Sequence, residues 1–280
     1  MSEEQITMRA RNNDLPDVSF VADRLRSIHM DAMADALLYL DETGELSRLT
    51  PLEAINRLAG IQLINNTNNA TLRYKRQARL YWPSADLADI IYKQDRHINI
   101  ALVDQFATNE YIRNSRNIMI TSATGCGKTF FACAFGNRAC EEQYTVRYFT
   151  MIDLLTEFQT AEARGRIVKF LNKLANTNLI VIDDFLLTSI TARDTEYLYR
   201  LFDSKPRRNK TRSFMICSQL MKEEMYTRLS SFSPGLADAI MNRVASRAYD
   251  FEIQGDSMRD VNIEKELQRQ RETQLKKRSI

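Results

Sequence analysis

The feature that most constrains the fold of this chain is the segment 122–129, with the sequence Ser-Ala-Thr-Gly-Cys-Gly-Lys-Thr. An apolar run at 117–121 precedes it and is typical of a buried strand, and residues 128–143 follow it with the pattern of a helix. A glycine-containing loop between a strand and a helix start directs backbone N–H groups toward one point, where the helix dipole also favours negative charge. The segment therefore predicts an α/β fold whose loop holds nucleotide phosphates.

Each residue type in this loop has a physical role in such a site. The Lys128 ammonium would reach the β- and γ-phosphate oxygens of ATP, and the Thr129 hydroxyl would be a ligand of Mg²⁺. The first glycine of the usual pattern is replaced by Ser122, so a residue with a Cβ atom has to make the tight turn. We expect the nucleotide to lie against these consecutive residues: Ser122, Ala123, Thr124, Gly125, Cys126, Gly127, Lys128, Thr129 and Phe130.

A second motif lies downstream, where residues 179–184 read Leu-Ile-Val-Ile-Asp-Asp. Four apolar residues fit a central parallel strand, and two carboxylates follow it, as in a Walker B element. Asp183 would hold Mg²⁺ directly or through water, and Asp184 would orient or deprotonate the attacking water. Two acids after an isolated strand are more often a solvated strand end. The phosphate loop upstream reverses that preference.

A third strand is predicted at 213–218, Ser-Phe-Met-Ile-Cys-Ser, and it also ends in polar residues. At that end, Gln219 or Ser218 would hydrogen-bond the γ-phosphate or its attacking water and so act as a nucleotide sensor. The sequence leaves the choice between the two residues open.

Together these motifs resemble the IstB/DnaC branch of the AAA+ ATPases, with the closest similarity to IstB, over residues 23–260. Further shared features are the segments 236–243, which ends in Arg243, and 255–259, which ends in Arg259. The resemblance implies that Arg243 is an arginine finger offered to a neighbouring subunit's nucleotide, and that Arg259 is a second sensor of the subunit's own nucleotide. It therefore implies a homo-oligomer. The chain departs from the family at Ser122 and at Leu186-Leu187, where relatives often carry glycine.

Composition agrees with a globular protein, because 44% of the 280 residues are hydrophobic and no apolar run is long enough to span a membrane. The amino terminus lacks the pattern of a signal peptide, so we expect a cytoplasmic location. Helical spacing and a Trp82-Pro83 pair predict an N-terminal helical region over 1–82 and an ATPase domain over 83–262. Within the first region, the capping box Thr-Pro-Leu-Glu at 50–53 predicts the start of a helix that runs toward Leu63. The remaining residues, 263–280, would form a basic tail.

The positive charges are unevenly distributed, although the net charge is only +3. Residues 54–85 contain no Asp or Glu, and a basic face is also predicted on a helix over 166–173, ahead of the strand that begins at residue 179. Either face fits the phosphate backbone of DNA, a basic solvated surface or an acidic partner. The residues expected to contact DNA are Arg73, Lys75, Arg76, Arg79, Arg166, Lys169 and Lys173.

The resemblance implies an ATPase that oligomerises on duplex DNA, largely without regard to sequence, and assists a partner transposase in choosing a target site. An alternative is a DnaC-like helicase loader, which would share the catalytic residues but bind a replicative helicase and prefer single-stranded DNA. A third hypothesis is an interaction module that binds ATP without hydrolysing it, which the replacement at Ser122 suggests and the intact Asp183-Asp184 pair disfavours.

Overall fold

The computed structural model describes residues 17–92, 96–206 and 210–255. The chain divides into two compact units, Met1–Leu72 and Arg73–Ile280, and the division falls within one long helix. This division lies upstream of the boundary at residue 82 that the Trp-Pro pair suggested. The reason is that Ala78 and Leu80, near the end of the helix, are buried in the core of the second unit.

The first unit is helical. Its apolar core consists of Leu37, Leu40 and Leu58, against which partly buried residues of the neighbouring helices pack. Its elements are α2 (Val18–Ser27), α3 (Asp31–Glu42), the 3-10 turn η2 (Leu46–Arg48) and the greater part of α4 (Pro51–Ala78).

Helix α4 begins at the capping box that the sequence predicts. The Glu53 carboxylate accepts a hydrogen bond from the Thr50 backbone N–H at 2.8 Å, and the Glu53 N–H donates to the Thr50 hydroxyl at 3.3 Å. The helix extends beyond Leu63 as far as Ala78 and ends at Arg79, whose φ of +54° cannot continue a right-handed helix.

The second unit contains a five-stranded parallel sheet in the order β2-β3-β4-β1-β5. The strands are β1 (Ile118–Thr121), β2 (Val146–Thr150), β3 (Leu179–Asp183), β4 (Ser213–Ser218) and β5 (Tyr249–Glu252). Register pairs Thr121 with Ser218 and Thr150 with Asp183, so the carboxyl ends of β1 to β4 meet at one edge. The predicted motifs that follow β1, β3 and β4 are therefore brought together at this edge.

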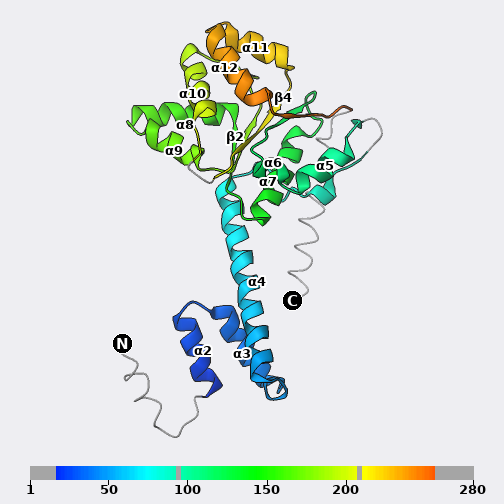
Figure 1. The fold of residues 1–280 in the computed structure, drawn as a ribbon, viewed down its shortest axis with the longest axis vertical. Helices are drawn as coiled ribbons and strands as arrows, with labels where there is room; N and C mark the ends of the chain where they lie inside the picture. The colour runs from blue at the N-terminus through cyan, green and yellow to red at the C-terminus, as the bar shows by residue number, and fades with distance from the viewer. Residues whose placement is uncertain (1–16, 93–95, 207–209, 256–280) are drawn as a thin grey trace, which may run out of the picture. The chain divides into compact units, whose positions relative to one another are not determined.

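Helices cover both faces of this sheet, as Figure 1 shows. Alternate residues of β3 face opposite cores: Val181 packs with one group of helices and Ile182 with the other. The first group is α5 (Ile100–Ala107), α6 (Glu110–Arg113) and α7 (Lys128–Glu141). The second group is α8 (Met151–Ala163), α9 (Ile167–Ala175), α10 (Ala192–Asp203), α11 (Lys222–Ser230) and α12 (Pro234–Ala245). Within the described residues, no helix is both long and apolar enough to cross a membrane.

Candidate nucleotide site

The loop between β1 and α7 has the backbone conformation that its glycines allow. Gly125 and Gly127 have φ values of +86° and +96°, in the region that residues with a Cβ atom rarely adopt. Ser122 is not among the described non-glycine residues with positive φ, so its Cβ atom causes no left-handed strain. Its hydroxyl donates to the Ala123 carbonyl at 2.9 Å. Serine is therefore compatible with the first position of this loop.

The Lys128 side chain lies along the inside of this loop. Its Nζ donates to the carbonyls of Ser122 at 2.9 Å and Ala123 at 3.0 Å, and to the Ser122 hydroxyl at 3.2 Å. The residue is only 6% exposed, and burial lowers the pKa of its ammonium. The ammonium is thus a partly desolvated cation held by neutral acceptors, which a phosphate oxygen would replace with a stronger, charged one.

Asp183, at the end of β3, accepts three hydrogen bonds and is 2% exposed. Its Oδ2 accepts from the Thr129 hydroxyl at 2.6 Å and from the Tyr148 hydroxyl at 2.8 Å, and its Oδ1 accepts from the Asp184 N–H at 3.0 Å. Thr129 and Asp183 are 54 positions apart in sequence and meet because β1 and β3 end at the same edge. Sequence reasoning missed Tyr148, which reaches Asp183 from the neighbouring strand β2.

The turn after β3 presents Asp184 toward solvent and buries the residues that follow. Asp184 and Leu186 have φ values of +52° and +57°, a conformation that costs a residue with a Cβ atom about 1–2 kcal/mol. The Leu186 side chain is fully buried, and Arg228 Nη1 donates to the carbonyls of Leu186 at 2.7 Å and Leu187 at 2.9 Å. These contacts stabilise the left-handed backbone conformation at Leu186.

The structure distinguishes between Ser218, the last residue of β4, and Gln219, which follows it. The Gln219 Oε1 accepts a hydrogen bond from the Thr124 hydroxyl at 2.6 Å, and Gln219 lines the cleft beside the loop. The Ser218 hydroxyl is fully buried and donates to the Phe185 carbonyl at 2.8 Å. Of the two, only Gln219 is placed to contact a nucleotide.

A cleft of about 440 Å³ lies beside the phosphate loop and is lined by Lys128, Asp183 and Gln219 among others. Its size suits a small ligand, and its polar groups converge from the loop and from the ends of β2, β3 and β4. Tyr81 and Trp82 add aromatic surface to the cleft. The lining residues are Tyr81, Trp82, Thr124, Gly125, Gly127, Lys128, Thr129, Phe130, Tyr148, Thr150, Asp183, Asp184 and Gln219.

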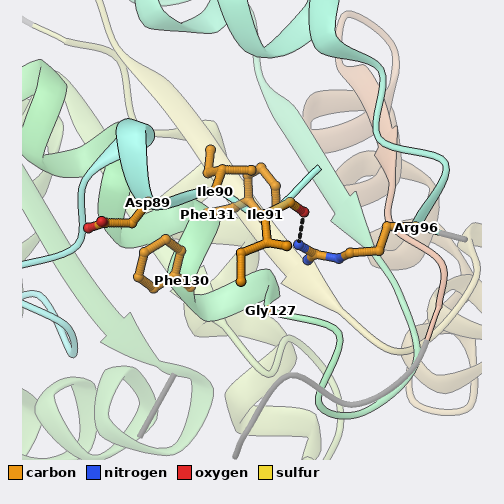
Figure 2. Close-up of a pocket in the computed structure, with 7 residues that line it drawn as sticks. All are labelled: Asp89, Ile90, Ile91, Arg96, Gly127, Phe130 and Phe131. Atoms are coloured by element: carbon orange, nitrogen blue, oxygen red, sulfur yellow. Dashed lines mark hydrogen bonds between the residues drawn. The ribbon is translucent and has the colours of Figure 1, made fainter. Parts of the chain in front are cut away.

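A small hollow lies behind the loop, between the segment after η3 (Leu87–Asp89) and the start of α7, and Figure 2 shows its lining residues. Arg96, which is 4% exposed, donates from Nη1 to the Ile91 carbonyl and from Nη2 to the Cys126 carbonyl, both at 2.7 Å. A trans peptide directs its N–H opposite to its C=O, so the bond at Cys126 turns the Gly127 N–H away from Arg96. Arg96 therefore fixes the orientation of a loop amide.

The predicted arginine finger, Arg243, does not line the cleft. Arg243, on α12, bonds Asp203 from Nη2 at 2.5 Å and the Ala239 carbonyl from Nη1 at 3.0 Å, and its guanidinium lies over the Tyr199 ring. Arg259 lies outside the described residues.

The predicted DNA-contacting residues are not equivalent in the structure. Lys75 forms an ion pair with Glu141 at 2.9 Å, whereas Arg79 is 70% exposed and lies 3.9 Å from a carboxylate oxygen of Glu157. The Arg73 guanidinium lies over the Tyr74 ring. The remaining members of the set are exposed: Arg76, Arg166, Lys169 and Lys173.

A comparison with protein families decides the relationship that this geometry suggests. A family model described as IstB-like ATP binding protein matches residues 23–266, which span most of both units and every motif above. The chain belongs to the IstB-like ATP-binding proteins.

Several relatives of this IstB-like protein are named as insertion sequence ATP-binding proteins. It is 29% identical over 244 residues to an insertion sequence ATP-binding protein of Sinorhizobium fredii, covering 87% of this chain and 96% of the relative. It is 32% identical over 148 residues to an ATP-binding protein of insertion sequence IS1162 from Pseudomonas fluorescens, covering 53% of this chain and 63% of the relative.

Among solved structures, AMPPCP-bound DnaA from Aquifex aeolicus is similar with a TM-score of 0.51 and 22% identity, over 67% of this chain and 55% of that one. This likeness confirms the predicted AAA+ fold. The IstB-like protein therefore binds ATP, is an ATPase, and has relatives described as insertion sequence ATP-binding proteins.

Proposed function

We propose that this IstB-like ATPase assembles, with ATP and Mg²⁺ bound, into a homo-oligomer on duplex DNA and assists a partner transposase in target-site selection. Hydrolysis of ATP ends that state. The support is the family, whose relatives are described as insertion sequence ATP-binding proteins, together with the arrangement of the site and the basic segments. The partner would be the transposase of the same insertion element.

The observation that carries the proposed chemistry is the 2.6 Å contact between the Thr129 hydroxyl and the Asp183 carboxylate. Two hard oxygen ligands at the mouth of a phosphate loop fit Mg²⁺, which would neutralise charge on the phosphates. Lys128 would bind the β- and γ-phosphates, and Asp184 and Gln219, which line the same cleft, would orient or deprotonate the attacking water. The loop amides around Gly125 and Gly127 would bind the remaining phosphate oxygens.

The proposed oligomer rests on Arg243. This side chain is 38% exposed and does not line the cleft of its own subunit, so it would have to act on the nucleotide of a neighbour. An arginine supplied in trans neutralises charge that develops during phosphoryl transfer. Arg259 would read the nucleotide of its own subunit, as the family resemblance implies.

The first test is binding of the full chain to labelled duplex and single-stranded DNA of random sequence. It is done with ATP, with ADP and without nucleotide, at two salt concentrations. Binding that requires ATP, prefers duplexes and weakens with salt supports the proposal. Preference for single strands supports the helicase-loader alternative, and failure to bind either form contradicts a role on DNA.

A phosphate-release assay tests the remaining alternative, the interaction module that does not hydrolyse ATP. Release of phosphate by the wild-type chain, lost on replacing Asp183 by Asn, agrees with the proposed ATPase cycle. Binding of ATP without phosphate release, even with DNA present, would favour the interaction module.

A further inference from the structure

A cluster of cations lies at the β2 edge of the sheet, where three separate segments meet. Arg79 follows the end of α4, Arg147 lies on β2, and their guanidinium nitrogens are 3.9 Å and 3.7 Å from the same Glu157 Oε1. Lys173, in the last turn of α9, is near enough to both arginines that their charges lower the pKa of its ammonium, Arg147 being the larger cause. Two arginines therefore share one carboxylate, with the Lys173 ammonium near them, which leaves an excess of positive charge.

Arg147 gives this cluster a buried donor without a partner. Its side chain is 12% exposed, and its guanidinium lies over the Phe149 ring at 5.2 Å. Its Nε is buried and has no hydrogen-bond partner among the described residues. A buried N–H donor without an acceptor raises the free energy of the folded state, and so does the repulsion between neighbouring positive charges. An anion bound among these side chains would offset the repulsion between the like charges.

We propose that Arg79, Arg147 and Lys173 form one docking site for a backbone phosphate of DNA. In this site Glu157 lies between the two arginines and competes with the phosphate for them. This inference rests on the proposed function and specifies its DNA surface. The sequence indicated the end of α4 and one face of α9 as two separate DNA-binding candidates. No sequence pattern indicated Arg147, which lies beside both Arg79 and Lys173. A nucleic acid is favoured because the chain leading to Arg79 is free of carboxylates from residue 54 onward, which suits an extended polyanion.

The proposed site is also connected to the nucleotide cleft. Tyr148, the neighbour of Arg147 on β2, points to the other face of the strand and donates to Asp183. Tyr81 and Trp82, shortly after Arg79, line the cleft itself. Two of the three segments that carry the cations therefore also contact the nucleotide site, so DNA binding is best measured with a non-hydrolysable ATP analogue present.

The test is fluorescence anisotropy of a labelled random-sequence duplex with the full chain over a range of salt concentrations. Lys173→Gln and Arg79→Gln each remove one exposed cation of the cluster. Lys222→Gln is the control, because Lys222, on α11, is a partly exposed cation paired with Asp250 at 2.7 Å. Each cluster variant should make the plot of log association constant against log salt concentration less steep by about 0.9. This change corresponds to about eightfold weaker DNA binding near ~0.1 M salt. Glu157→Gln should strengthen binding.

The outcomes separate this inference from the function on which it rests. If the wild-type chain binds no duplex under any condition, the proposed function and the phosphate site are both wrong. If the wild-type chain binds duplex DNA but both cluster variants behave like Lys222→Gln, the DNA-binding function stands and the cluster is not its phosphate site. Thermal unfolding midpoints close to that of the wild type show that the exposed substitutions leave the fold intact.

Discussion

Replacement of Arg96 by Met would test how the phosphate loop is held in shape. The substitution removes both 2.7 Å hydrogen bonds, to the carbonyls of Ile91 and Cys126, while retaining much of the apolar stem. Without the bond at Cys126, the following peptide is free to turn, and the Gly127 N–H is no longer fixed away from Arg96. An N–H bond to a charged phosphate is worth about 1.5–3 kcal/mol, so ATP should bind about ten- to a hundredfold more weakly.

The assay is calorimetric or fluorescence titration of the full chain with an ATP analogue. Arg212→Met is the matched control, because Arg212 is also buried, at 8% exposed, and bonds the Ser204 hydroxyl at 2.8 Å. It directly precedes β4, at the end of the sheet opposite the cleft, so its loss should reduce thermal stability without changing nucleotide affinity. If Arg96→Met bound the analogue within about twofold of the wild type, the proposed role of Arg96 in orienting the loop would be refuted.

Three further substitutions test the site. Lys128→Ala should abolish nucleotide binding and assembly, because it removes the cation inside the loop, and both are measured by titration and light scattering. Arg243→Ala should retain ATP binding and lose hydrolysis, and a wild-type rate of phosphate release would show that the finger assignment is wrong. Tyr148→Phe should raise the Mg²⁺ concentration for half-maximal hydrolysis about tenfold, since Asp183 loses one of the donors that orient it; an unchanged requirement would exclude this role.

Local patterns in the sequence were sufficient to predict the elements of the nucleotide site. The strand before the phosphate loop, the helix after it, the buried strand that ends at Asp183 and the strand that ends at Ser218 are all present in the structure. The capping box at Thr50 is confirmed as well. These predictions succeeded because each depends on residues close together in the chain: apolar runs, glycines with positive φ, and a carboxylate three residues after a cap.

Contacts between residues far apart in the sequence could not be predicted without the tertiary structure. The sheet order decides that Tyr148 meets Asp183, and that Arg147 lies beside cations from two distant helices, because no local pattern encodes which strand lies next to which. Arg96 is a similar case, since its function is to bond a carbonyl 30 positions away. The sequence by itself determined the fold class and the residues of the phosphate loop. Only packing decided which of Ser218 and Gln219 faces the cleft, since neighbouring residues at a strand end point in opposite directions.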